Sequence, residues 1–124
     1  MATGTIKAPS KLSISTIVAN TTISSDGSTA TDTVNTYNGA KLSDYDIICI
    51  NLKAFDADIR NNVTIPRVIF TNGNKVTVYA PHGASLEHNS GITVQYKNDT
   101  SVYATRVGDK LIGILSIDGI KLNN

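Results

Sequence analysis

Hydrophobic and polar residues alternate with a period of two along most of the chain, which is the pattern of half-buried β-strands. The first alternating segment, LSISTI, covers residues 12–17, and a β-branched segment follows at 20–24. No window combines apolar residues at helical spacing with capping residues, so no long helix is expected. Only residues 67–70, directly after Pro66, are expected to form one helical turn.

The second half of the chain is richer in strand signals. Residues 45–54, YDIICINLKA, begin as an almost continuous apolar run, which predicts a central strand covered on both faces. Alternating segments follow at 75–80, 92–96, 100–107 and 111–121, with turn-forming residues between them. Short strands separated by regular turns are typical of an antiparallel sandwich or barrel. The expected fold is therefore all-β, an antiparallel and jelly-roll-like β-sandwich.

The first 37 residues are more polar than the rest, and their strand patterns are weaker. We expect residues 1–37 to form polar strands or a connector, and residues 38–124 to form the sandwich domain. The turn dipeptide Asn38-Gly39 marks the border between them. The alternative is a single continuous domain over residues 1–124.

Charge and hydropathy exclude several kinds of partner. The chain has 11 Lys+Arg against 10 Asp+Glu, so it lacks the basic excess of a nucleic-acid-binding surface. The longest apolar stretch, Ile47–Ile50, is far shorter than a membrane span, so no membrane insertion is expected. Only 17% of residues are charged, against about 25% in an average domain, which indicates a neutral-polar surface. Because a chain this small buries only about two-thirds of the surface that it exposes when unfolded, self-association is a further expectation.

Catalytic and metal-binding residues are not evident. The single cysteine, Cys49, lies in the apolar run and is interpreted as a small core residue. The carboxylate pairs Asp44/Asp46 and Asp56/Asp58 have a spacing that a glycosidase could use, but they flank a strand start and a turn. Nucleotide-binding and nucleophile motifs are absent from the sequence. We therefore expect a protein that is not an enzyme, with no catalytic residue, cofactor or metal.

Loops held by strands are the expected place for binding. The loops expected to bind are 81–91 and 97–100, and the side chains that supply directional hydrogen bonds there, His82, Glu87, His88, Asn98 and Asp99, are the candidate receptor-binding residues. His82 and His88 with Glu87 between them lack the fixed spacing of a metal motif. The competing interpretation of all five is that they are ordinary solvated turn residues. Within the strands, Tyr79, Tyr96 and Tyr103 either pack on the sheet with a hydroxyl at its rim or stack on a sugar or base.

Several short motifs resemble the C-terminal head domains of tailed-bacteriophage tail fibres and tail spikes. They are LSDYD at 42–46 with the apolar strand 47–52, TIPRVIF at 64–70, the strands at 94–105, and ILSIDGIK at 114–121. The resemblance covers residues 38–122. It implies a homotrimeric β-sandwich head that binds a host-surface glycan or protein without catalysis. It also implies a location on the virion, at the phage tail or capsid surface, after synthesis in the bacterial cytoplasm.

Three functional hypotheses follow from the sequence. The first is the trimeric receptor-binding head. The second is a structural virion component such as a capsid decoration protein, which would also be a trimer. The third is a monomeric carbohydrate-binding module, which the absence of tryptophan disfavours because such modules usually offer an aromatic platform.

Overall fold

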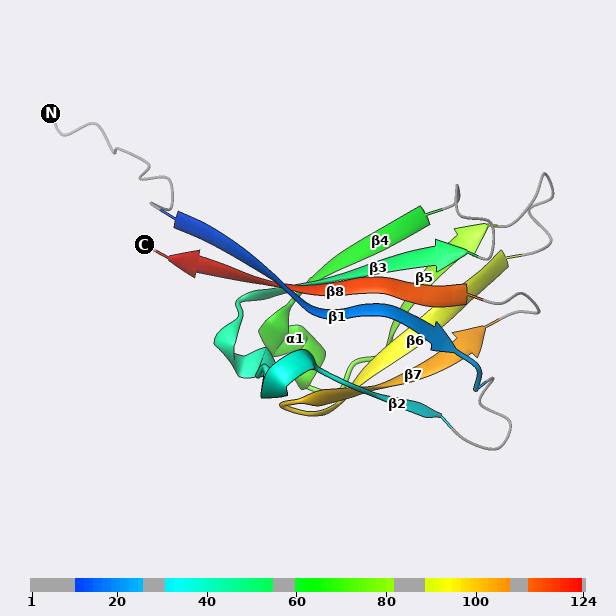
Figure 1. Ribbon diagram of the computed structural model, residues 1–124, viewed down its shortest axis with the longest axis horizontal. Helices are drawn as coiled ribbons and strands as arrows, with labels where there is room; N and C mark the ends of the chain where they lie inside the picture. Colours follow the sequence, from blue (N-terminus) through cyan, green and yellow to red (C-terminus); the bar gives the residue numbers. More distant parts are fainter. Residues whose placement is uncertain (1–10, 26–30, 55–59, 82–88, 108–111, 124) are drawn as a thin grey trace, which may run out of the picture.

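Two packed β-sheets make up the computed structural model of this chain, which describes residues 11–25, 31–54, 60–81, 89–107 and 112–123 (Figure 1). A short helix, α1 (Arg67–Thr71), and two 3-10 turns, η1 (Tyr37–Gly39) and η2 (Leu42–Asp44), complete these segments. The strands are β1 (Lys11–Ile23), β2 (Asp32–Asn35), β3 (Ile47–Ala54), β4 (Arg60–Pro66), β5 (Val76–Pro81), β6 (Asn89–Asn98), β7 (Ser101–Val107) and β8 (Ile112–Asn123).

The strands pair antiparallel throughout, in two sheets of four. Sheet A has the order β1-β8-β3-β4, and sheet B has the order β2-β7-β6-β5. The first strand thus lies beside the last, and the second beside the last but one. The nesting ends there, because β3 pairs with β4 as well as with β8, and β5 pairs with β6, so the hairpins β3–β4 and β5–β6 complete the two sheets of the sandwich. The expected all-β sandwich is confirmed.

The N-terminal strands are integral parts of both sheets. β1 pairs with β8 from Lys11 opposite Asn123 to Ile23 opposite Ile112, and β2 pairs with β7. A β-bulge interrupts the β1–β8 ladder between Thr16 and Val18. Residues 11–25 and 31–35 therefore share one hydrophobic core with the segments that follow them.

The core lies between the inner faces of the two sheets, where every second side chain is apolar. Its members include Ile48, Ile50, Leu52, Val78, Ile92, Val94, Val102 and Ala104. The side chains of Phe70 and Leu42 close the end of the sandwich at which α1 and η2 lie, and both are fully buried. The ring of Phe70 meets that of Tyr96 edge to face, with centroids 6.4 Å apart.

β3 is central in sheet A, as predicted, but the prediction that both its faces are covered is wrong. Its inner side chains Ile48, Ile50 and Leu52 are fully buried. Its outer side chains are only half-buried, and they include Cys49 and Asn51. The physical reason is that an antiparallel sheet needs cover on one face only, so an apolar run does not by itself indicate two covered faces.

Local signals at two turns are confirmed. The helical turn expected at residues 67–70 is α1. Asn38 and Gly39 have φ angles of 53° and 66°, a left-handed conformation that asparagine and glycine adopt more easily than other residues. Within the segments described above, no helix is long and apolar enough to cross a membrane.

Replacing Phe70 by alanine tests the end closure of the core. Because the ring is completely buried and packs on Tyr96, we expect Phe70→Ala to lower the free energy of unfolding by about 3–5 kcal/mol. The matched control is Val68→Ala in the same helix, where the side chain is 61% exposed and the change should stay within about 0.5 kcal/mol. Urea denaturation followed by circular dichroism measures both. Equal effects of the two variants would contradict this account of the core.

Candidate functional site

The outer face of sheet B is a surface of hydroxyl and amide side chains. Val78 of β5 and Val94 of β6 point into the core, so their neighbours in sequence point outward. The strand register then places Thr77, Thr93 and Thr105 in one row across three strands. The hydroxyl groups of Thr77 and Thr93 are 2.8 Å apart and share a hydrogen bond.

A second row beside the first contains Gln95 and Tyr103, which are cross-strand partners, with Thr33 of β2 opposite Tyr103. The amide of Gln95 donates to the carbonyl of Gly73 over 3.1 Å, which fixes its orientation. Together the two rows form the floor of an open hollow of about 510 Å³, lined by Thr31, Lys75, Thr77, Thr93, Gln95, Tyr103 and Thr105.

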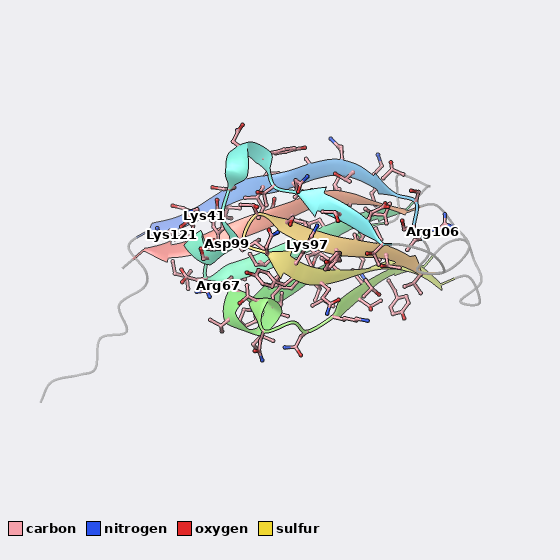
Figure 2. The ribbon with its side chains drawn as sticks, turned by 90° about the horizontal axis from the view of Figure 1, so that it is seen from below. Lys41, Arg67, Lys97, Asp99, Arg106 and Lys121 are labelled. Carbon is pink, nitrogen blue, oxygen red and sulfur yellow. The ribbon has the colours of Figure 1, made fainter. Side chains whose placement is uncertain are left out.

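Lys97 lies beside the hollow on the same face (Figure 2). Its ammonium nitrogen is 5.4 Å from the centre of the Tyr103 ring and donates to the hydroxyl of Thr33 over 3.3 Å. An exposed cation–π contact of this kind is worth about 0.5–1 kcal/mol. Lys97 therefore stabilises the ring only weakly and can leave it when another group approaches.

The three strand tyrosines occupy different environments. Tyr96 points inward and packs on Phe70, as the packing interpretation predicts. Tyr79 is on the outer side of sheet B and 45% exposed. Tyr103 is half-buried in the floor of the hollow, where its ring and hydroxyl can both meet a ligand. Of the three, only Tyr103 combines partial burial with a place in a concave surface.

The turn between β6 and β7 contains two of the predicted receptor-binding residues, Asn98 and Asp99. The side-chain oxygen of Asn98 accepts hydrogen bonds from the backbone N–H of Thr100, over 3.0 Å, and from the hydroxyl of Ser101, over 2.8 Å. Asp99 binds Ser43 through both carboxylate oxygens, over 2.8 Å to its N–H and 2.7 Å to its hydroxyl. These contacts bind the turn to η2 and so order both segments.

The pKa of the Asp99 carboxyl lies below its usual value of 3.8. The main cause is the hydrogen bond from the Ser43 hydroxyl, and Lys41 and Arg67, at the same end of the molecule (Figure 2), add to it. The pKa of Asp32 is also lowered, mainly by the hydroxyl of Ser25 and then by the N–H of Ser24.

The other predicted site residues, His82, Glu87 and His88, lie outside the described residues, as do Asp56 and Asp58. The role of His82, Glu87 and His88 in receptor binding remains a prediction. Within the described segments no three His, Cys, Asp or Glu side chains are grouped so that they could hold a metal ion. Asp46 accepts a hydrogen bond from the backbone N–H of Leu122 over 2.8 Å, which ties the start of β3 to β8.

The outer face of sheet A carries a second polar network, which is closed on itself. Asp118 accepts hydrogen bonds from Thr16, over 2.9 Å, and from Asn51, over 3.1 Å, and Asn51 also donates to Ser116. Cys49 lies beside this network, with the hydroxyl of Thr64 3.7 Å from its sulfur. The polar atoms of this network bind one another across four strands and so reinforce the sheet. Because they are already hydrogen-bonded to one another, the hollow of sheet B is the better candidate for a binding site.

Sequence reasoning missed the hollow because it searched the loops. The available signal was the alternation itself, since Thr77, Thr93 and Thr105 occupy the outward positions of segments already recognised as strands. What the sequence did not supply is the register that brings these three positions into one row.

Comparison of the chain with protein-family models, with curated proteins and with solved structures finds no match.

The Asp99–Ser43 contact predicts a change of stability at acidic pH. Because the carboxyl pKa is lower in the folded chain than in the unfolded chain, the stabilisation is complete above the ordinary pKa of 3.8 and is lost as the pH falls below it. We expect Asp99→Asn to lower stability at neutral pH and to reduce the loss of stability that the native chain shows as the pH falls below the ordinary carboxyl pKa.

The partner variant Ser43→Ala is the control, because it removes the hydroxyl whose hydrogen bond is the largest single cause of the lowered Asp99 pKa. Ser43→Ala should likewise weaken the dependence of stability on pH under acidic conditions. The double variant should lose little more stability than either single variant. Urea denaturation at each pH measures all three proteins. Fully additive effects would show that the two side chains act independently.

Proposed function

We propose that this chain is a non-catalytic recognition domain of a phage virion that binds a host-surface glycan or protein through the hollow of sheet B. The proposal includes a homotrimer, a location at the phage tail or capsid surface, and synthesis in the bacterial cytoplasm. The observation that carries it is the concave outer face of sheet B, where three threonine hydroxyls lie in one row beside a half-buried tyrosine.

The chemistry of this face suits a sugar better than a charged macromolecule. Each threonine hydroxyl both donates and accepts a hydrogen bond, as each sugar hydroxyl does. The Tyr103 ring offers an apolar surface for the C–H face of a sugar, with its hydroxyl available at the edge. Lys75 lines the hollow and Lys97 lies beside it on the Tyr103 ring, so the hollow suits a neutral or an anionic sugar better than a cationic ligand.

The site is also well ordered for binding. Apart from Thr31, which directly precedes β2, its hydroxyl and ring groups come from strands in the middle and at the edge of sheet B. Side chains on paired strands lose less conformational freedom on binding than side chains on loops, because the backbone is already fixed. Lys97 costs little to displace from the Tyr103 ring, as its contact is weak.

Three copies would compensate for the weakness of one open hollow. An open site that offers only a few hydrogen bonds and one ring is expected to bind weakly. Linking several such sites in one particle raises the apparent affinity by about 10²–10⁴ when a host surface presents many copies of the ligand. A homotrimer on the virion therefore fits a receptor-binding role for this face.

A structural virion component is the second candidate, favoured by exposed apolar residues at one end of β1 and β8, Leu12, Ile14 and Leu122. Such residues suit docking on a larger particle. A monomeric carbohydrate-binding module would share the sheet B site but would not associate. Binding of labelled protein to bacterial cells separates the first candidate from the second, and molar mass separates it from the third.

Substitution of Tyr103 tests the proposed site. We expect Tyr103→Ala to weaken binding of fluorescently labelled protein to glycans on an array, or to bacterial cells, by about tenfold or more, because the ring is lost. The matched control is Tyr79→Ala, which removes an exposed tyrosine of the same sheet from outside the hollow and should leave binding unchanged.

Circular dichroism of both variants checks that the sheets remain intact. If the native chain binds no glycan and no cell in a broad panel, the receptor-binding proposal fails and the structural role gains support. If Tyr103→Ala binds as well as the native chain, the hollow is not the site.

A further inference from the structure

Two lysines on the outer face of sheet B have no carboxylate partner within the described residues. Lys75, directly before β5, lines the hollow at one edge of the sheet. Lys97 of β6 reaches across the ring of Tyr103 to the hydroxyl of Thr33 on β2, the strand at the other edge (Figure 2). Because both lysine side chains are exposed, their charges are available to a ligand that enters the hollow.

The described carboxylates of sheet B and of its β6–β7 turn are bound elsewhere. Asp32 lies between two outward-facing threonines and so points to the other side of the sheet, where it accepts hydrogen bonds from the N–H of Ser24 and the hydroxyl of Ser25. Asp99 binds Ser43 through both of its oxygens. None of the residues that line the hollow is acidic. The charge that the described residues present at the hollow is therefore positive.

The position of Lys97 decides which ligand gains most from the site. Its ammonium lies 5.4 Å from the centre of the Tyr103 ring, so a sugar that stacks on this ring must displace it. A neutral sugar replaces the cation–π contact by stacking and leaves the ammonium to water. An anionic sugar also offers the displaced ammonium a charge-assisted hydrogen bond, which is stronger than a hydrogen bond between neutral groups.

The hydroxyl of Thr33 supplies a second donor at the same place. It accepts the hydrogen bond from Lys97 over 3.3 Å, so its own O–H proton is available to an acceptor on a ligand. Thr33 is also the cross-strand partner of Tyr103. An anionic group on a sugar that stacks on Tyr103 would thus meet the Thr33 hydroxyl and the Lys97 ammonium together.

We propose that the hollow of sheet B binds an anionic sugar, with its ring on Tyr103 and its carboxylate, sulfate or phosphate group between Lys97 and Thr33. This inference rests on the proposed function, because it names the chemical class of the glycan that the same site takes. Lys75 adds a second positive charge at the β5 edge, which suits a glycan with acidic groups on more than one unit. A cationic ligand would meet two like charges.

Paired glycans test the charge preference. The labelled full chain is applied to an array of uronic-acid and sialic-acid oligosaccharides, each beside its methyl ester, and of sulfated and phosphorylated sugars, each beside its unmodified form. We expect at least one anionic glycan to bind about tenfold or more tightly than its neutral counterpart. This difference should shrink as NaCl is raised from about 50 mM to about 500 mM, because salt screens exposed charges.

The variant Lys97→Ala gives a sharper test, because its effects on the two glycans of a pair differ. Loss of the ammonium should weaken binding of the anionic glycan about tenfold, whereas the uncovered Tyr103 ring should bind the neutral counterpart as well as before or better. Lys75→Ala should weaken binding of the anionic glycan alone. The matched control, Lys121→Ala, removes an exposed lysine from β8 of sheet A and should leave both affinities unchanged. Circular dichroism verifies that each variant is folded.

The outcomes separate this inference from the proposed function. Equal binding of anionic and neutral glycans, or an equal loss of both in Lys97→Ala, would overturn the preference for an anionic sugar while the receptor-binding role stands. Binding to host cells through a protein, with no glycan bound, would have the same meaning. A native chain that binds no glycan and no cell would overturn both proposals.

Discussion

Burial of Ile48, Ile50 and Leu52 between the sheets determines which side chains of sheet A point into the core and which point outward. These three side chains of β3 are fully buried and pack toward β5 and β6 of sheet B. Each buried aliphatic side chain contributes about 1.5–3 kcal/mol, so exposing the set would exceed the stability margin of a small domain. Because strand side chains alternate, fixing which residues of β3 point inward also fixes which point outward, and the strand register extends this choice across the sheet.

The two outer faces that result are chemically different. Sheet A presents a hydrogen-bonded network around Asp118 and an apolar surface beside it, whereas sheet B presents threonine hydroxyls and the ring of Tyr103. Sheet A thus has features of a surface that another protein covers, and sheet B has features of a surface that meets a small polar ligand. The sandwich separates them by the thickness of the core, about 10 Å, so both can be occupied at once.

Much of the fold could be predicted from the sequence because its signals are local. Alternation located the strands, Asn38-Gly39 located a turn, and the position after Pro66 located α1. The pairing of β1 with β8 was not predictable, since these two strands stand at opposite ends of the described chain. The error on β3 has a related origin. Cys49 lies in an apolar stretch of sequence, but its exposure depends on whether another element covers the outer face of the sheet. The local sequence pattern does not indicate whether such an element is present.

The candidate site was the least predictable part. Its residues come from β5, β6 and β7, from Lys75 just before β5 and from a threonine just before β2. The short turn between β6 and β7 indicates that these two strands are neighbours, but spacing alone does not place the residues before β2 beside them. Asn98 and Asp99 have the composition of a binding loop, yet their polar atoms are used in organising the turn and its contact with Ser43. Side-chain type indicates which hydrogen bonds a residue can make, but only the fold decides with which partner.

The place of β8 in the interior of sheet A has a consequence for how the protein acquires its structure. β8 is the last of the described strands and separates β1 from β3, so until β8 has left the ribosome β1 lacks its neighbour in the sheet and β3 can pair only with β4. Pairings between residues so distant in sequence close large loops, which slows folding to milliseconds or seconds in proteins of this class. During that interval the apolar segment around Ile14 is without its strand partner, and it is the stretch most in need of protection from premature aggregation.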